Sequence, residues 1–244
     1  LAVYNIKGGV GKTATSVNLA YLASTEGKTL LLDMDPQGSA SFYFRIRSPE
    51  KFGTKKLLKG GKHVEENIRG TDYANLDMLP ADFSYRNIDI ALDDCKKSQK
   101  RLSKVLQPLT EEYRHIILDC PPNLTLLSEN IFYAADRILV PVIPTTLSLL
   151  SLEQLYPFLD EIEQGRDKVR IFFSMVEKRK KLHSDMMATK KDAPGLLHTT
   201  IPYSADIERM GVYRQPVTAA LPTSVAATAY QGLWQEIREA LVAP

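Results

Sequence analysis

The sequence predicts an α/β fold: a mostly parallel, twisted β-sheet with helices on both faces. Short runs rich in Ile, Leu and Val alternate with longer stretches in which apolar residues recur at helical spacing, and this alternation is typical of βαβ units. The short runs are apolar at nearly every position, as expected for parallel strands that are buried on both faces. No internal repeat or low-complexity linker interrupts the pattern, so we predict a single domain over residues 1–244.

Each apolar run is bounded by turn residues, which set the limits of the predicted strands. In chain order, the predicted strands are residues 1–6, 29–35, 76–81, 115–121, 137–143 and 169–175. The helices predicted between or after them are residues 13–26, 125–135, 147–164 and 224–242. The segment from about residue 45 to 70 is polar and basic, and we expect it to lie outside the sheet.

The last predicted helix has one apolar face. The residues on that face are Tyr230, Leu233, Trp234, Ile237 and Leu241. The opposite side lacks the excess of Lys and Arg that a helix lying on a membrane surface requires. We therefore expect this helix to pack against the sheet.

Composition and charge exclude several classes of protein. The chain is 44% hydrophobic and 25% charged, as in ordinary globular proteins, and its formal net charge is +2. A nucleic-acid surface would therefore have to come from a local basic patch. Cys95 and Cys120 lie far apart without a CxxC pattern, which argues against a disulfide framework, a zinc site or a cysteine-ligated cluster. No stretch has the length of a membrane span and no signal peptide precedes the first strand, so we expect a cytoplasmic location.

The first predicted strand leads into NIKGGVGKT, residues 5–13, which resembles a phosphate-binding loop. The usual pattern is G-x-x-x-x-G-K-[ST], whereas this chain has Ile6 at the first glycine position and an additional lysine, Lys7, beside it. The strand before the loop and the helix after it favour a phosphate site over a glycine-rich turn without a ligand. The predicted nucleotide-binding residues of the loop are Lys7, Gly8, Gly9, Val10, Gly11, Lys12, Thr13 and Ala14.

Two predicted strands end in carboxylates that suit the metal ion of such a site. Asp119 follows one apolar run and precedes two prolines, while Asp33 and Asp35 end another strand and project to the same side. We expect ATP or ADP with Mg²⁺, and a metal site formed by Thr13, Asp33 and Asp119. Lys12 would neutralise the β- and γ-phosphates, and Asp35 would orient the attacking water. The alternative is that Asp33 and Asp35 only cap the next helix.

Three stretches occur together in the order and spacing of the ParA/MinD family of deviant Walker A ATPases. They are KGGVGKT (7–13), DMDPQG (33–38) and ILDCPP (117–122). Residues 76–81 and 199–217 also resemble segments of that family, so the likeness covers nearly the whole chain. The DPQG and DCPP stretches are most similar to the ParA branch. In the last segment, the resemblance implies that Pro202 lines the pocket for the adenine base.

The resemblance implies a homodimer that forms in the ATP state, in which two subunits enclose two ATP molecules. Lys7 matches the signature lysine of the family, which reaches the phosphates of the partner subunit. A cation supplied in this way stabilises transition-state charge as an arginine finger does. The implied catalytic residues are therefore Lys7, Lys12 and Asp35, and dimer formation would depend on ATP.

ParA-branch proteins bind non-specific DNA as ATP dimers and release it when a partner stimulates hydrolysis. The resemblance thus implies nucleoid association and a ParB-like or cargo-adaptor partner, with a plasmid, a chromosome or a protein assembly such as a carboxysome as cargo. The candidate DNA-binding residues are Lys178, Arg179, Lys180, Lys181, Lys190, Lys191, Arg209 and Arg214. A charge run of this kind is also compatible with an ordinary solvated surface. Tyr203 and Asp206 occupy the stretch where ParA-branch proteins often have arginines, which favours a different DNA footprint.

Other functions of this fold fit the sequence less well. A MinD-like membrane cycle requires a basic amphipathic C-terminal tail, and WQEIREALVAP is not one. A cluster carrier requires bridging cysteines, and a ligase of the dethiobiotin synthetase type would not predict Lys7 together with DPQG. If Asp35 does not lie where it can orient the attacking water, the protein would instead be a scaffold that binds nucleotide without hydrolysing it. No helix-turn-helix segment precedes the first strand, so we do not expect sequence-specific repression.

Overall fold

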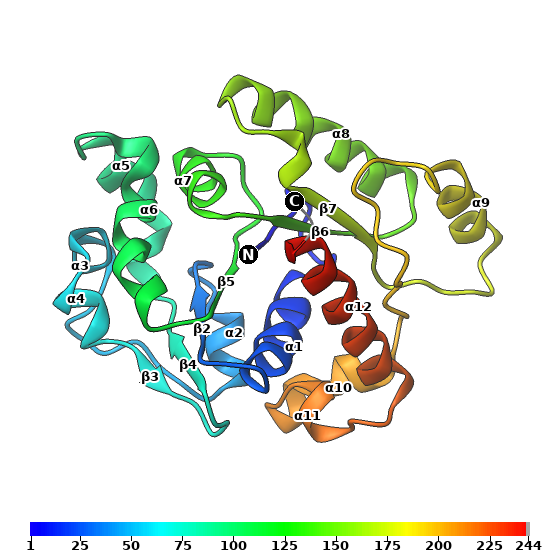
Figure 1. The fold of residues 1–244 in the computed structure, drawn as a ribbon, viewed down its shortest axis with the longest axis horizontal. Coiled ribbons are helices and arrows are strands. Elements are labelled where there is room, and N and C mark those ends of the chain that lie inside the picture. The colour runs from blue at the N-terminus through cyan, green and yellow to red at the C-terminus, as the bar shows by residue number, and fades with distance from the viewer. Residues whose placement is uncertain (243–244) are drawn as a thin grey trace.

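The computed structural model describes residues 1–242, with side chains through residue 240. Its centre is a seven-stranded sheet in the order β3-β4-β2-β5-β1-β6-β7, with helices on both faces (Figure 1). The strands are β1 (Ala2–Val3), β2 (Thr29–Asp33), β3 (Arg69–Gly70), β4 (Leu76–Leu79), β5 (His115–Asp119), β6 (Ile138–Val142) and β7 (Val169–Phe173). Neighbouring strands are parallel except β3, which is antiparallel to β4. The predicted fold class is confirmed.

Helices form the connections between the strands. The α-helices are α1 (Lys12–Ser24), α2 (Ser39–Tyr43), α3 (Thr54–Lys59), α4 (Lys62–Glu65), α5 (Ile88–Asp93), α6 (Arg101–Leu106), α7 (Leu126–Ala134), α8 (Thr146–Glu161), α9 (Lys181–Thr189), α10 (Ala205–Tyr213), α11 (Val217–Ala220) and α12 (Val225–Val242). The 3₁₀ helices are η1 (Phe83–Asn87), η2 (Ser98–Lys100), η3 (Gln107–Glu111) and η4 (Arg166–Lys168). Every strand and helix predicted from the sequence forms, but β1 is only Ala2–Val3 where residues 1–6 were predicted. Most helices that were not predicted are short, with too few turns to give a detectable periodicity. The exceptions are α9 and α10, which have nine residues each, as many as the predicted helix α7.

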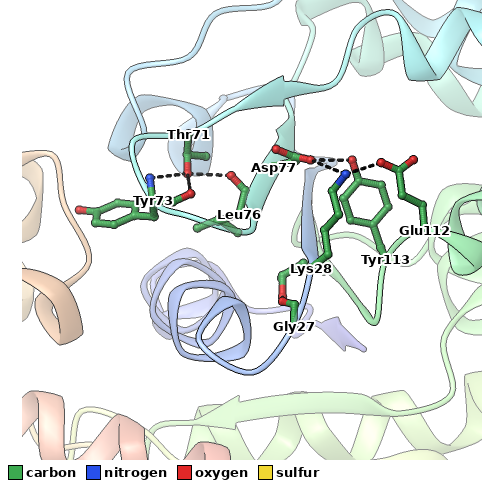
Figure 2. Close-up of polar contacts among 9 residues, drawn as sticks. Gly27, Lys28, Thr71, Tyr73, Leu76, Asp77, Glu112 and Tyr113 are labelled. Atoms are coloured by element: carbon green, nitrogen blue, oxygen red, sulfur yellow. Dashed lines mark hydrogen bonds and ion pairs between the residues drawn. The ribbon is translucent and has the colours of Figure 1, made fainter.

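The basic segment from about residue 45 to 70 differs from its prediction at one end. Helices α3 and α4 lie outside the sheet as expected, but Arg69 and Gly70 form β3 and pair with Met78 and Asp77. The expectation that the whole segment lies outside the sheet was therefore wrong. A polar turn allows the chain to return beside β4, because Thr71 Oγ1 donates to the carbonyl of Leu76 at 2.8 Å (Figure 2).

A group of polar side chains fastens the amino-terminal ends of the parallel strands (Figure 2). Lys28, just before β2, forms ion pairs with Glu112 and with Asp77 of β4, the latter at 3.6 Å. The hydroxyl of Tyr113 donates to Asp77 at 2.8 Å, and Lys28 Nζ lies 5.0 Å from the centre of the Tyr113 ring. These contacts lie at the end of the sheet opposite to the glycine-rich loop, and they leave the carboxyl ends of the strands free for a site.

Two apolar cores cover the two faces of the sheet, because successive side chains of each strand point to opposite faces. Leu30 and Leu32 of β2 belong to the core that also contains side chains of α3 and α5–α8. Leu31 belongs to the other core, with α1 and the long helix α12. In α12 the predicted apolar residues are buried, namely Tyr230, Leu233, Trp234 and Ile237. The side chain of Leu241, predicted for the same face, lies outside the described side chains.

Candidate nucleotide site

The glycine-rich loop connects β1, an inner strand between β5 and β6, to α1. Gly9 and Gly11 have φ angles of 74° and 90°, which favour glycine because a side chain is rarely accommodated there. At Gly11 a Cβ atom would also lie 3.1 Å from Ser174 Oγ, on the loop after β7. The helix begins at Lys12, one residue before the predicted start, and the amide of Thr15 donates to the carbonyl of Gly11 at 3.0 Å. The loop thus has the strand–loop–helix context of a phosphate site.

The two lysines of the loop differ in their surroundings. Lys12 is buried, and its Nζ donates to the backbone carbonyl of Lys7 at 3.1 Å. Burial lowers the pKa of Lys12, while the nearby carboxylates of Asp119 and Asp35 act in the opposite direction. Lys7 is half-buried and makes no ion pair within the described side chains. Lys12 is thus held inside its own loop, and the ammonium of Lys7 is not.

A buried asparagine fixes the first half of the loop. Asn5 Oδ1 accepts hydrogen bonds from the backbone amide of Lys7 at 2.8 Å and from Ser151 Oγ at 3.1 Å. Its Nδ2 donates to the carbonyl of Pro141 in β6 at 2.8 Å. Sequence reasoning did not assign a role to Asn5. The available signal was a polar residue at the end of an otherwise apolar strand.

The two carboxylates predicted for the metal site lie side by side. Asp33 of β2 and Asp119 of β5 are paired across the parallel strands, and the amide of Met34 donates to the carbonyl of Asp119 at 2.9 Å. Both side chains are almost completely buried. Burial raises the pKa of each carboxyl group above its ordinary value, and the charge of Asp33 raises the pKa of Asp119 further. The pair is therefore a place where a cation would be stabilised.

The hydrogen bonds of Asp119 leave one oxygen without a partner. Ser16 Oγ donates to Asp119 Oδ1 at 2.8 Å, and Asp119 Oδ2 is buried with no partner. The Thr13 side chain lies close enough to Asp119 to lower the pKa of that carboxyl group, and the assignment of both residues to a metal site stays a prediction. Hydroxyl and carboxylate oxygens are the ligand types that Mg²⁺ prefers. Residues 1–240 contain no cluster of three or more His, Cys, Asp or Glu side chains suited to a metal, so phosphate and water oxygens would have to complete the coordination.

Asp33 also holds the helix that follows it. Asp33 Oδ2 accepts hydrogen bonds from the backbone amide and the hydroxyl of Ser41 in α2, at 2.8 and 2.7 Å. The hydroxyl of Ser41 in turn accepts from the amide of Ala81, after β4, at 3.0 Å. This arrangement matches the alternative that Asp33 caps the next helix, while its position beside Asp119 is the one that the metal prediction requires. Ser41 was not singled out in the sequence.

Asp35 lies in the turn between β2 and α2. It is half-buried, and its Oδ1 accepts from the backbone amide of Gln37 at 3.0 Å. The carbonyl of Asp35 accepts from the amide of Gly38 at 2.9 Å, where Gly38 has a φ of 66°. The charge of Asp35 opposes the lowering of the pKa of Lys12, so the two side chains are close enough to interact. Asp35 thus belongs to the turn beside the phosphate loop, and its role in orienting water stays a prediction.

A small cavity of about 60 Å³ lies beside Gly11. Ala14 and Pro202, both predicted to contact nucleotide, line it together with Met175, Tyr203 and other residues. The segment that carries Pro202 is fixed beside β7, since the amide of Val176 donates to the carbonyl of Ile201 at 2.9 Å. The structure thus brings the predicted base-pocket residue to the phosphate loop. Tyr203 is the neighbour of Pro202 in the segment predicted to hold the base, whereas Met175, on the loop after β7, was not predicted to line this cavity.

The basic residues predicted to contact DNA fall into two separate regions. Residues 178–181 are exposed: the first three lie in the turn before α9 and Lys181 begins that helix, while Lys190 and Lys191 follow it. Arg209 and Arg214 lie at the other region, on α10 and at its end (Figure 1).

Several of these basic side chains have partners within the chain. Lys180 pairs with Glu177, and Lys190 lies 3.5 Å from Glu153. Arg214 Nε donates to the carbonyl of Phe42 at 3.1 Å, and its guanidinium lies 4.3 Å from the centre of the Phe42 ring. The exposed residues 178–181 therefore form the region that is more accessible to DNA. Arg214 instead fastens the end of α10 to α2.

Neither cysteine forms a disulfide, and the side chain of Cys120 is buried in the core. Burial raises the pKa of its thiol. Among residues 1–242, no helix combines the length and the apolar character needed to cross a membrane.

Comparison with known proteins gives the family of the chain. The AAA domain family matches residues 1–171. The chromosome partitioning protein ParA of Myxococcus xanthus (strain DK1622) is 39% identical over 167 residues, which cover 68% of this chain and 59% of that protein. The chromosome-partitioning ATPase Soj of Treponema pallidum (strain Nichols) is 30% identical over 244 residues, which cover 97% of this chain and 96% of Soj.

The fold is also found in a solved structure. A candidate plasmid partition protein from Borrelia burgdorferi B31, bound to AMPPNP, superposes with a TM-score of 0.86. It is 23% identical, and the match covers 98% of this chain and 97% of that one, so this likeness concerns the fold. The predicted motifs, the loop geometry and the two sequence matches all indicate the same family. The chain belongs to the ParA/Soj family of P-loop ATPases.

Proposed function

We propose that this chain is a nucleotide-controlled dimer switch that hydrolyses ATP to ADP and phosphate in the presence of Mg²⁺. In the ATP state two copies would enclose two nucleotides and bind non-specific DNA. A partner protein, ParB-like or a cargo adaptor, would stimulate hydrolysis and so release the DNA. The cycle would segregate a plasmid or chromosome, or position a protein cargo, in the cytoplasm on the nucleoid.

The contrast between the two loop lysines is the observation that best supports this proposal. Lys12 is buried and already bound to a carbonyl of its own loop, at 3.1 Å. Lys7 carries a second positive charge at the same loop with no ion pair among the described side chains. A site that served only its own nucleotide would need one such lysine. A second cation is accounted for if it neutralises phosphate charge in another subunit.

The carboxylate pair supports dependence on Mg²⁺. Asp119 Oδ2 is buried without a hydrogen-bond partner, and Asp33 is paired with Asp119 across the strands. We propose that Thr13, Asp33 and Asp119 hold the ion directly or through its water molecules. When bound, Mg²⁺ would offset phosphate charge. Asp35, in the turn after β2, would then orient the attacking water, and Pro202 and Ala14 would contact the base.

Exposed lysines and arginines support the proposed binding of DNA. Residues 178–181 are exposed, on the turn before α9 and at the first residue of that helix, where they can reach phosphates without a change in fold. Because the formal net charge of the chain is only +2, such binding would depend on this local patch. Doubling the patch in an ATP dimer would strengthen binding through two linked contacts.

The test measures oligomeric state and DNA binding as a function of nucleotide. The purified chain is incubated with Mg²⁺ and ATP, with Mg²⁺ and ADP, or without nucleotide, and then analysed by light scattering and by binding to unrelated duplex DNA. We expect a dimer that binds DNA only with ATP. DNA binding that is equal in all three conditions would contradict the switch. Binding to anionic vesicles in place of DNA would favour the MinD-like alternative, and consumption of ATP only with an organic acid or amine acceptor would favour a ligase.

A further inference from the structure

A groove of about 670 Å³ lies far from the phosphate loop, between α3 and the helices η1 and α5. In Figure 1 α3 and α5 lie at the left rim of the molecule, on the side opposite to α9. Neither the glycine-rich loop nor the segments that carry Asp33, Asp119 and Pro202 line the groove. It is therefore a separate feature of the fold.

One wall of the groove is basic. Lys51, Lys55 and Lys56 line it, and Lys51 and Lys55 are exposed. None of the three forms an ion pair within the described side chains. Asp94 is the one acidic residue of the lining, so positive charge exceeds negative charge at this surface. These lysines belong to the basic segment for which the proposed ATPase cycle gives no role.

The remainder of the groove is largely apolar. Phe52 and Ala91 line it, and so does Ile90, whose side chain is 70% exposed. Phe83 lies nearby on η1 and is 67% exposed. Large apolar side chains that stay this accessible at the edge of a concave surface are typical of a site that binds another molecule.

Hydrogen bonds join the two walls of the groove and fix their relative position. The amide of Thr54 in α3 donates to Ser84 Oγ of η1 at 2.8 Å, and the two hydroxyls lie 3.0 Å apart. Asp82 fixes Ser84 in turn, because Asp82 Oδ1 accepts from the amide of Ser84 at 2.9 Å. The walls are thus joined in the free protein, and a ligand would meet a largely preformed surface, which lowers the entropic cost of binding.

We propose that this groove binds an acidic, amphipathic segment of a partner protein. An apolar side chain of that segment would pack against Phe52 and Ile90, and its carboxylates would lie against the three lysines. Charge complementarity favours this occupant, because an uncharged apolar segment would leave the lysines without a role. Duplex DNA fits less well, since its phosphates would meet an apolar surface that includes Asp94, while DNA contacts need dispersed cations on an open face. The inference does not depend on nucleotide binding or hydrolysis.

The experiment uses the full chain without nucleotide and a fluorescein-labelled twelve-residue peptide in which Glu alternates with Leu and Phe. Two matched peptides carry Lys in place of Glu, or Ser in place of Leu and Phe. Fluorescence anisotropy should show binding of the acidic amphipathic peptide about tenfold tighter than that of either matched peptide. Equal affinity for the acidic and the basic peptide, or no binding of the acidic one, would overturn the proposal.

Two variants then locate the binding surface. The double variant K51E/K55E and the single variant I90S should each weaken peptide binding about tenfold, because one removes the charge contacts and the other the apolar contact. The control variant K178E/K181E makes the same change in charge at another exposed surface, around the start of α9. It should bind the peptide like the unchanged protein. All three changes are at exposed side chains, and thermal unfolding checks that the fold is kept. If K51E/K55E instead weakens binding of duplex DNA and leaves peptide binding unchanged, the groove belongs to a nucleic-acid surface and the proposal is wrong.

Discussion

Asp33 and Asp119 face each other across β2 and β5, and Asp119 Oδ2 is the carboxylate oxygen of this pair that has no hydrogen-bond partner. Asp33 is bonded to Ser41 and to the amide of Asp35, and Asp119 Oδ1 is bonded to Ser16. The pair of carboxyl groups is thus buried, and one of its oxygens lacks a hydrogen-bond partner. This geometry connects the carboxyl end of the sheet to α1 through Ser16 and to α2 through Ser41, and the first predictions concern the residues around it.

The two loop lysines are expected to fail in different ways when replaced by alanine. Lys7→Ala should keep nucleotide binding close to that of the unchanged protein, because Lys12 remains in the loop, but should not dimerise with ATP. Lys12→Ala should lose nucleotide binding itself, since its ammonium lies among the loop carbonyls and the carboxylates. Nucleotide affinity is measured with a fluorescent ATP analogue and dimer formation by light scattering. A Lys7→Ala protein that dimerises normally would exclude a role for Lys7 in the partner subunit.

Asp35→Ala is expected to bind ATP and dimerise but to hydrolyse ATP slowly. The physical reason is that Asp35 belongs to the turn beside the phosphate loop, where it would orient water without being needed to bind phosphate. Loss of such a residue typically lowers turnover by about 10²–10⁴-fold. Phosphate release is followed together with the persistence of the ATP dimer. Gln37→Ala, in the same turn but with an exposed side chain, is the matched control. Undiminished turnover in Asp35→Ala would remove this residue from the mechanism.

Replacing the basic run 178–181 with neutral residues should weaken binding to duplex DNA and flatten its dependence on salt. Each lost phosphate contact lowers the slope of log affinity against log salt by about 0.9 for B-form DNA. Binding is measured over a series of salt concentrations with ATP present. Neutralising Lys55 and Lys59 on α3 removes charge from another exposed surface and serves as the control. If DNA binding does not change, the contacts must be sought at Arg209 and its neighbours on α10.

Ser41→Ala should destabilise the fold by about 1–3 kcal/mol, because it leaves buried polar groups without partners. The hydroxyl of Ser41 donates to Asp33 and accepts from the buried amide of Ala81. The free energy of unfolding is measured by urea denaturation, and the variants are compared on the basis of equal m-values. Ser39→Ala, in the same helix but exposed, should change stability much less. Equal effects of the two substitutions would show that the hydrogen bonds of Ser41 contribute little to stability.

Gly195→Ala should destabilise the protein by at least about 1 kcal/mol, because its backbone conformation and its surroundings both exclude a side chain. The φ angle of Gly195 is 75°, and a Cβ atom would lie 2.4 Å from the carbonyl oxygen of Val169. Gly211→Ala, inside α10 and in open space, should leave stability unchanged or raise it by up to about 1 kcal/mol. Thermal unfolding of both variants is the test. A stable Gly195→Ala protein would mean that the chain beside β7 can move away.

The sheet, the phosphate loop and the carboxylates could be predicted because each has a strong local signature. Buried parallel strands are apolar throughout, and the stretches around Lys12, Asp33 and Asp119 have fixed order and spacing. The antiparallel strand at Arg69 could not be predicted in this way. It is short and polar, and it exists only because a turn returns the chain to β4. Its stability comes from tertiary pairing, which the local sequence does not record.

The supporting residues of the site were missed for a related reason. Asn5 and Ser41 contact groups that lie far away in the chain, such as Pro141 and Ala81. A single polar residue has no periodicity, and its partners are known only once the fold is known. For Asp33 the sequence left two alternatives open, a carboxylate at the phosphate site or a cap of the next helix. In the structure Asp33 lies beside Asp119 and also holds α2 through Ser41, a partner that the sequence did not identify.

The backbones of the two loop lysines are attached to different parts of the molecule. The amide of Lys7 is bonded to Asn5, which is bonded in turn to β6 and to Ser151 in α8. Lys12 is instead the first residue of α1. A displacement of α8 would therefore act first on the half of the loop that carries Lys7, and it would reach Lys12 through the hydrogen bond between the Lys12 ammonium and the Lys7 carbonyl. Although α8 lies outside the loop, its position is linked in this way to both positive charges.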